Sequence, residues 1–299
     1  MNSNADIEYK ISMDKKHGLF MSDFNEYQKD EFGLIIVPDA SMTVSDAKQI
    51  TKNINADILI LDHHLQEKEF FNKETSQEIN RIEAKELWNK DKDALIADSY
   101  TNYCLAVNCT DGQYPNPSLC GAGVVQKFIE AYIQTYGEED DIPEELLTEY
   151  YDLVSLANIA DSMDLRSLET RYYVLEGLKQ TQYRNEFINE LVDRNADDMK
   201  WGRTIISMAW TIAPKINGCV RYGSEDEQIE MFRAFLGEQE DIEYQPRRKK
   251  ASDPKPDIEI HTLQWDAARI CGNIKSRQDT EVRKFVQDLT SKIEEQKLD

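Results

Sequence analysis

Two short apolar runs near the beginning of the chain define the first predicted elements. Residues 33–37 and residues 57–61 are rich in isoleucine, leucine and valine, and runs of this length predict buried strands rather than typical helices. Between them lies a turn, after which Thr43 or Ser45 could cap a helix that runs to about Ile54. Strand, helix and strand in this order predict a parallel βαβ unit.

The hydrophobic pattern of the remaining chain is mostly helical. Residues 66–98 are rich in Glu, Lys, Asn and Asp and predict an exposed helix, and a further strand is predicted around residues 104–107. The amphipathic pattern of residues 121–136 predicts a helix. Another predicted helix covers residues 143–161, and the chain is then mainly helical to about Leu236.

These elements predict an α/β fold, in which a parallel β-sheet flanked by helices is followed by a helical region and a long C-terminal connecting helix. We expect one domain over residues 1–237, with its α/β part at about 7–136 and its helical part at about 143–237. Residues 238–257 are low in hydrophobicity and predict a polar linker. Apolar residues recur on one stripe of residues 258–299, which predicts the connecting helix.

Composition narrows the classes of function. The chain has 299 residues, of which 40% are hydrophobic, and its formal net charge is -22, from 57 acidic and 35 basic residues. This charge argues against a general polyanion-binding surface, although an acidic metal site can meet phosphate through its cations. No apolar run approaches the length of a membrane span, and the five cysteines form no CxxC pair. We therefore expect a cytoplasmic protein with reduced thiols.

The most informative polar cluster is Asp62-His63-His64, which directly follows the second predicted strand. Asp39 lies just past the first strand, and the carboxyl ends of neighbouring parallel strands meet at one edge of a sheet. A carboxylate and two imidazoles suit Mn²⁺, Mg²⁺ or Zn²⁺, and the chain has only four histidines. The tripeptide alone is also compatible with chance surface polarity, so its neighbourhood decides between the two interpretations.

That neighbourhood contains an ordered set of segments. Asp39 and the tripeptide are followed by Gly121-Ala122-Gly123 at the start of a predicted helix and by residues 160–165, which include Asp161. In this order the segments resemble the DHH phosphoesterase superfamily, whose motif is named for the tripeptide.

Later segments resemble one branch of that superfamily. Residues 213–221, Ala-Pro-Lys-Ile-Asn-Gly-Cys-Val-Arg, are similar to the Pro-Arg-x-Asn-Ala-x-Gly-Arg signature of the RecJ branch, whose members are single-strand-specific 5′→3′ exonucleases. The segments Glu169-Thr170-Arg171 and Arg277-Gln278-Asp279 agree with the same branch. The resemblance covers most of residues 7–299.

The resemblance implies a site for two divalent cations, usually Mn²⁺ or Mg²⁺. Asp39 matches the carboxylate that bridges both cations, and His63 and Asp161 match ligands of one of them. Asp62 would orient this cluster or help to ligate it, and is therefore also a candidate catalytic residue. Divalent cations activate water and offset the charge that grows on the phosphate during hydrolysis.

The resemblance also implies contacts with the substrate. His64 matches the residue that contacts the scissile phosphate, which gives it a catalytic and a substrate-binding role. Asn217 and Arg221 match positions that hold the phosphate and backbone of the substrate. The basic run Arg247–Lys250 fits either a solvated linker or a nucleic-acid patch.

The chain departs from the family pattern in several places. Residues 1–38 lack the His and Asp-x-Asp pair of the family's first motif, the second family domain (DHHA1) is missing, and Ser41 and Val220 replace two usual glycines. We therefore expect either a longer parent chain or separate partners, namely an N-terminal fragment that supplies the first motif and a DHHA1-containing fragment. The isolated chain is expected to bind one metal weakly and the pair poorly.

The resemblance implies a metal-dependent phosphodiesterase domain of a RecJ-like 5′→3′ single-stranded DNA exonuclease, as used in DNA repair and recombination. The missing motif leaves open an enzyme that needs a complementing segment, or an inactive or split subunit. A second alternative is a non-catalytic DHH-derived scaffold in a replication or repair complex. A third is a small-substrate DHH phosphodiesterase, such as an oligoribonuclease or a cyclic-dinucleotide phosphodiesterase.

Overall fold

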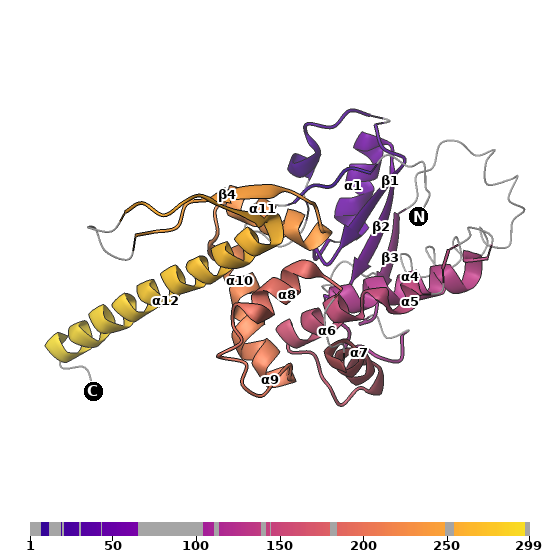
Figure 1. Ribbon diagram of the computed structural model, residues 1–299. Helices are drawn as coiled ribbons and strands as arrows, with labels where there is room; N and C mark the ends of the chain where they lie inside the picture. The colour runs from indigo at the N-terminus through magenta and orange to yellow at the C-terminus, as the bar shows by residue number, and fades with distance from the viewer. Residues whose placement is uncertain are drawn as a thin grey trace, which may run out of the picture. The chain divides into compact units, whose positions relative to one another are not determined.

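The chain forms two compact units in the computed structural model (Figure 1). Unit 1 comprises Met1–Tyr150 and Asp161–Tyr173, and unit 2 comprises Tyr151–Ala160 and Val174–Asp299. The predicted exposed helix at residues 66–98 lies outside the residues that the structure describes. Those residues are 7–11, 19, 21–29, 31–42, 44–64, 104–110, 114–138, 142–143, 145–179, 184–248 and 254–296.

Unit 1 is built on a parallel sheet, which confirms the predicted α/β fold. Its described strands are β1 (Leu34–Pro38), β2 (Asp57–Asp62) and β3 (Cys104–Asn108), in the order β1-β2-β3. Helix α1 (Val44–Ile54) connects β1 to β2 and lies beside the sheet in Figure 1. A short 3-10 helix, η1 (Met21–Phe24), precedes β1.

The core of unit 1 lies between α1 and the sheet. Alternating residues of a strand point to opposite faces, and Val37, Ile58 and Ile60 bury one face of β1 and β2 against Ala47 and Ile50 of α1. The other face of β2 is buried too, which explains why its sequence is continuously apolar rather than alternating. This packing holds the carboxyl ends of β1 and β2 in fixed register.

The helices after the sheet largely follow the predicted pattern. Helix α4 (Gly121–Tyr136) has the predicted bounds and contacts β2 and β1. The single helix predicted for residues 143–161 is instead two, α5 (Leu146–Glu149) and α6 (Tyr151–Ala160). The break falls at Tyr150, whose φ of -102° and ψ of 14° are not helical.

Unit 2 is mainly helical, as the sequence predicted. Before residue 237, its described part contains α6, the end of α7 (Leu168–Lys179), which begins in unit 1, and a series of further helical segments. These are α8 (Glu186–Asp193), α9 (Ile205–Ser207), the π-helix η2 (Met208–Ile212), α10 (Ala213–Tyr222) and α11 (Glu225–Leu236). A capping box formed by Ser224 and Glu227 starts α11, and Gly237 in the left-handed conformation ends it.

The segment predicted as a polar linker, residues 238–257, contains a strand. In the structure β4 (Asp241–Tyr244) pairs antiparallel with β5 (Glu259–Thr262), and the long helix α12 (Leu263–Gln296) begins after β5 rather than at about 258. Polar and apolar residues alternate over only four positions in β4, and β5 contains a single apolar residue, Ile260. This is too short a pattern to stand out from the surrounding charge.

Helix α12 carries the predicted apolar stripe, but only its first half is buried. Leu263, Ala267 and Ile274 are at most 1% exposed, whereas Val282 and Phe285 are more than half exposed. The first half of the helix packs on α8, α10 and α11 of unit 2. Among the helices in the described part of the chain, none combines the length and the apolar character needed to cross a bilayer.

One half-buried carboxyl of unit 2, that of Glu230, has an unusual pKa. Burial, followed by a hydrogen bond and charge repulsion from Asp266 of α12, raises the pKa of Glu230 on α11 to about 7. Its Oε1 is buried without a hydrogen-bond partner among the described residues. A proton held on Glu230 therefore stabilises the folded state.

Replacing Glu230 with Gln is expected to stabilise the protein at about pH 8 by roughly 1–2 kcal/mol, since each pKa unit corresponds to about 1.4 kcal/mol and the side chain is only partly buried. Because folding raises the pKa of Glu230, the free energy of unfolding of the wild type should fall as pH rises from 4.5 towards 7. Urea unfolding across this range measures the effect. The exposed Glu294→Gln should leave the pH dependence intact, and an unchanged slope in Glu230→Gln would contradict the prediction.

Candidate functional site

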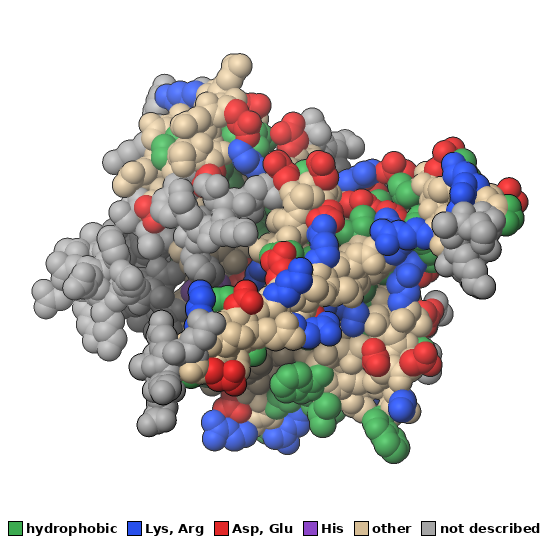
Figure 2. Space-filling view, turned by 90° about the vertical axis from the view of Figure 1, so that its left-hand side faces the viewer, with side chains coloured by type: hydrophobic (Ala, Val, Ile, Leu, Met, Phe, Trp, Pro, Cys, Tyr) green, Lys and Arg blue, Asp and Glu red, His purple; other side chains and the backbone are tan. Residues whose placement is uncertain are grey.

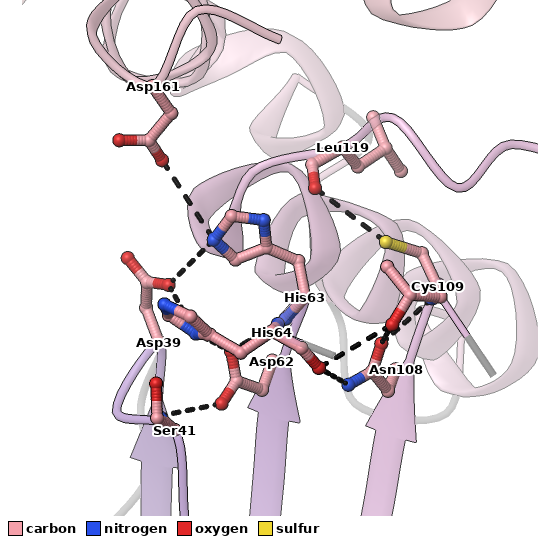
Figure 3. A network of polar contacts seen from close by, with 10 residues as sticks. Asp39, Ser41, Asp62, His63, His64, Asn108, Cys109, Leu119 and Asp161 are labelled. Carbon is pink, nitrogen blue, oxygen red and sulfur yellow. Dashed lines mark hydrogen bonds and ion pairs between the residues drawn. The ribbon is translucent and has the colours of Figure 1, made fainter. Parts of the chain in front are cut away.

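The carboxyl ends of the parallel strands bring together the predicted cluster of acids and histidines (Figure 3). Asp39 directly follows β1, Asp62 is the last residue of β2, and His63 and His64 come next. Each of these four side chains offers one ligand atom, and all four atoms lie within 4.8 Å of one another. Asp39 and Asp62 are distant in sequence, but the sheet brings them together because the residues before them, Pro38 and Leu61, are paired in register.

Asp39 is held in a backbone conformation that few residues adopt. Its φ is +50°, and its N–H donates to the Leu61 carbonyl at 2.9 Å. Left-handed backbone is costly for a residue with a side chain, and such strain clusters at functional sites. The start of α4 lies so close that a Cβ on Gly121 would fall 2.6 Å from Asp39 Oδ1 and closer still to its Cγ. Glycine at 121 therefore leaves room for the Asp39 carboxylate.

Asp62 is completely buried and accepts hydrogen bonds on both oxygens. Oδ2 accepts from the Ser41 N–H at 2.8 Å. Oδ1 accepts from the N–H groups of His63 at 2.6 Å and His64 at 3.1 Å, and lies 2.7 Å from His64 Nδ1. Asp62 thus fixes the backbone of the turn at Ser41 and of the two histidines that follow it. It also orients the His64 ring, with Nδ1 as the donor.

His63 links Asp39 to Asp161. Its Nε2 lies 3.1 Å from Asp39 Oδ1 and 4.0 Å from Asp161 Oδ2, as Figure 3 shows. The hydrogen bond to Asp39 and the surrounding carboxylates raise the pKa of His63, although burial opposes them. Burial and then the Asp39 charge raise the pKa of Asp161. A cation that binds here must therefore displace a proton from His63 at lower pH.

Two residues that sequence reasoning did not single out support the cluster. Asn108, at the end of β3, pairs in register with Asp62, and its Nδ2 donates to the His64 carbonyl at 2.9 Å. Thr110 donates its N–H to Asn108 Oδ1 at 2.8 Å and so fixes the orientation of the amide. The signal was available in the sequence, because Asn108 directly follows the third predicted strand just as Asp62 follows the second.

The Glu169-Thr170 segment has a structural role in unit 1. Buried Asn116 donates to Glu169 Oε2 at 2.9 Å and Thr170 Oγ1 at 3.1 Å, and Thr170 donates to the Ser118 carbonyl at 2.6 Å. Lys127 of α4 lies 3.3 Å from Glu169 Oε1. These contacts tie the segment before α4 to the start of α7.

The two other predicted substrate contacts, Asn217 and Arg221, lie in unit 2. Both are on α10, where Asn217 is half-buried and Arg221 is exposed. Their proposed contact with substrate stays a prediction.

The donor set fits a hard divalent cation. Asp39 and Asp161 offer carboxylate oxygens, and His63 and His64 offer imidazole nitrogens, which together suit Mn²⁺ or Mg²⁺. Burial raises the pKa of Cys120 to about 12, so this nearby thiol stays protonated and is a poor ligand. Because both Asp62 oxygens already accept hydrogen bonds, Asp62 is better suited to position the other ligands than to bind a cation itself.

Comparison with known proteins gives sequence relatives in Bacillus and its phage. The chain is 28% identical over 294 residues to YorK of Bacillus subtilis strain 168, whose name marks it as an inferred SPbeta prophage-derived single-strand DNA-specific exonuclease. It matches the corresponding protein of Bacillus phage SPbeta to the same extent. The match covers 98% of this chain and 43% of each relative, so the chain spans less than half of their length. No family model matches the chain.

Solved structures of RecJ share the fold. An exonuclease RecJ bound to manganese aligns with a TM-score of 0.56 at 16% identity, covering 87% of this chain and 50% of that one. RecJ from Thermus thermophilus in complex with Mn²⁺ aligns with a TM-score of 0.50 at 16% identity, covering 86% and 30%. These likenesses in sequence and in fold confirm the predicted resemblance to RecJ-like DHH nucleases.

Proposed function

We propose that this chain forms the catalytic part of a metal-dependent phosphodiesterase that degrades single-stranded DNA from the 5′ end, as a RecJ-like exonuclease. The observation that carries the proposal is the convergence of Asp39, His63 and His64 at the carboxyl edge of the sheet, around the buried Asp62. The sequence relatives are named as single-strand DNA-specific exonucleases, which supports the choice of substrate.

In this proposal the side chains divide into ligands and supports. Asp39, His63 and Asp161 would hold Mn²⁺ or Mg²⁺, with the His63 ring between the two carboxylates, at 3.1 Å from Asp39 and 4.0 Å from Asp161. When bound, divalent cations would activate water and offset the charge that develops on the phosphate. Asp62 positions both histidines through its hydrogen bonds, and the Nε2 side of His64 is left to contact the scissile phosphate.

Substrate contacts outside the cluster come from Asn217 and Arg221 in this proposal. A planar guanidinium can pair with two phosphate oxygens, which an ammonium group cannot do in the same geometry. An N-terminal fragment that completes the metal site, and a DHHA1-containing fragment, remain proposed partners. The cytoplasm remains the proposed location.

The experiment that tests the function combines metal binding with nuclease activity. Mn²⁺ is titrated into the chain by calorimetry, and degradation of 5′-labelled single-stranded DNA is followed with Mn²⁺ and with a chelator. We expect Mn²⁺-dependent release of short products, which the chelator abolishes, when the chain is mixed with a fragment that carries the family's first motif, and little release from the chain alone. A double-stranded DNA substrate and a cyclic dinucleotide, run in parallel, distinguish the exonuclease from a small-substrate enzyme.

The variant His63→Ala is expected to lower both Mn²⁺ affinity and hydrolysis by about 100-fold or more, since one lost ligand removes several kcal/mol of stabilisation. His261→Ala, a histidine change in unit 2, is the matched control and should keep both. Unchanged Mn²⁺ affinity in His63→Ala would refute the metal site. Mn²⁺ binding without hydrolysis of any substrate, even with the fragment that carries the first motif present, would support the scaffold alternative instead.

A further inference from the structure

A groove of about 710 Å³ runs along the long helix of unit 2. One wall is a single face of α12, formed by residues three or four positions apart. The other contributions come from α11 and from the segment after β4. The charged residues that line the groove are Arg247, Arg269, Arg277, Lys284, Glu227 and Glu281.

Four cations in one groove are unusual on a chain with a net charge of -22. Two of them are already paired: Arg269 with Asp266, and Arg277 with Glu227. Arg247 and Lys284 are exposed and form no ion pair within the described part of the chain. The groove therefore offers two cations without an ion pair in the described part of the chain. It also offers two paired cations, Arg269 and Arg277, which could contact a phosphate in addition to their carboxylate partners.

The rest of the lining is mainly polar: Asn273 offers an amide donor, whereas the Ser276 and Thr280 hydroxyls already donate to the carbonyls of Gly272 and Ser276. Asn273, Ser276 and Thr280 lie on the same face of α12 as the cations. Short polar side chains between cations are the groups that commonly contact phosphate oxygens without reading bases. Figure 2 faces the side on which α12 ends, and there Lys and Arg side chains run across the middle of the surface with Asp and Glu among them.

The basic run at residues 247–250 is partly explained by this groove. Sequence alone left the run open between a solvated linker and a nucleic-acid patch, and the structure places its first residue, Arg247, among the residues that line the groove. The β4–β5 pair anchors the segment that carries Arg247, since β4 ends at Tyr244 and pairs there with Glu259. Arg247 thus lines the same groove as the cations of α12.

We propose that this groove binds the phosphodiester backbone of single-stranded DNA, without a metal ion. The choice of ligand rests on the proposed function, but the groove lies in unit 2 and shares no residue with the metal cluster. A row of cations along a groove tracks a flexible phosphate chain and binds it without sequence preference. The negative charge elsewhere on the chain would keep a polyanion confined to this groove.

The test measures binding in the presence of a chelator, so that no metal and no hydrolysis are involved. Fluorescence anisotropy follows a labelled oligothymidylate titrated with the full chain at several salt concentrations. The groove variant is Arg247→Ala with Lys284→Ala. The matched control is Arg248→Ala with Lys292→Ala, which removes the same charge from exposed neighbours that do not line the groove.

The groove variant should lose about tenfold in affinity and about 1.4 from the magnitude of the salt slope, at roughly 0.7 for each lost phosphate contact to a single strand. The control should stay within about twofold of the wild type. Equal losses in both variants, or none in either, would overturn the proposal. A groove that bound polyglutamate in place of DNA would also overturn it.

Failure of this proposal and failure of the proposed function are distinguishable. His63→Ala should lose Mn²⁺ binding but bind the oligonucleotide normally under chelation. If the groove variant binds normally while hydrolysis still depends on Mn²⁺, only the groove proposal is refuted. If hydrolysis is never seen while binding depends on Arg247 and Lys284, only the proposed catalysis is refuted.

Discussion

Replacing Asp62 with Ala is expected to destabilise the chain by about 3 kcal/mol or more and to abolish metal-dependent hydrolysis. Asp62 is 0% exposed, and its carboxylate accepts the backbone N–H groups of Ser41, His63 and His64. Each buried donor left without a partner costs about 1–3 kcal/mol. The same change releases the His64 ring, which is oriented by Asp62 Oδ1.

The less drastic change, Asp62→Asn, separates charge from shape. An asparagine keeps one oxygen that can accept, but its NH₂ group cannot accept from the Ser41 N–H or from the histidine N–H groups. We expect a smaller loss of stability, about 1–3 kcal/mol, because hydrogen bonds to a charged partner are the stronger ones. Hydrolysis should still fall by about 10–100-fold, the usual cost of losing a residue that orients metal ligands.

Urea unfolding and Mn²⁺ titration of both variants test these expectations. Asp57→Asn is the matched control, because Asp57 starts the same strand at the end away from the cluster. It should leave Mn²⁺ affinity unchanged. Wild-type stability in Asp62→Ala would show that the three N–H groups find other partners, and full activity in Asp62→Asn would show that the charge is not needed.

The position of the site was predictable because strand order and register follow from simple patterns. Two apolar runs with a helix between them predict parallel neighbours, and this alone brings Asp39 beside the tripeptide. The joining of Asp161 to the cluster was not predictable in this way. It lies just beyond α6, and only the family resemblance singled it out.

The features that sequence reasoning missed are those decided by tertiary contacts. Nothing in the pattern of residues 143–161 marks Tyr150 as a break, since tyrosine is tolerated inside helices. The β4–β5 pair escaped notice because each strand has four residues and their partners are distant in sequence. The hydrogen bond from the Ser41 N–H to Asp62 depends on the left-handed turn at Asp39 and Ser41, a conformation that serine seldom adopts.

Gly121 is the residue through which the sheet and α4 together shape the proposed metal site. The sequence placed Gly121 at the start of a predicted helix, and the structure identifies the Asp39 side chain as the group that the glycine accommodates. Since Asp39 is already held at φ +50° by its N–H bond to Leu61, its carboxylate cannot move away without a change of backbone or of rotamer.

Replacing Gly121 with Ala is therefore expected to displace Asp39 and reduce hydrolysis by about 100-fold, because small misplacements of a reacting group are this costly. Alanine favours a helix over glycine by about 1 kcal/mol, so helix propensity alone would make the variant more stable. A loss of both stability and Mn²⁺ affinity would then isolate the clash with Asp39.

Gly33→Ala and Gly272→Ala are matched controls, since a Cβ at either position meets nothing within 4 Å. If Gly121→Ala binds Mn²⁺ as the wild type does, Asp39 either has room to turn aside or is not a ligand, and the paired variant Asp39→Asn decides which.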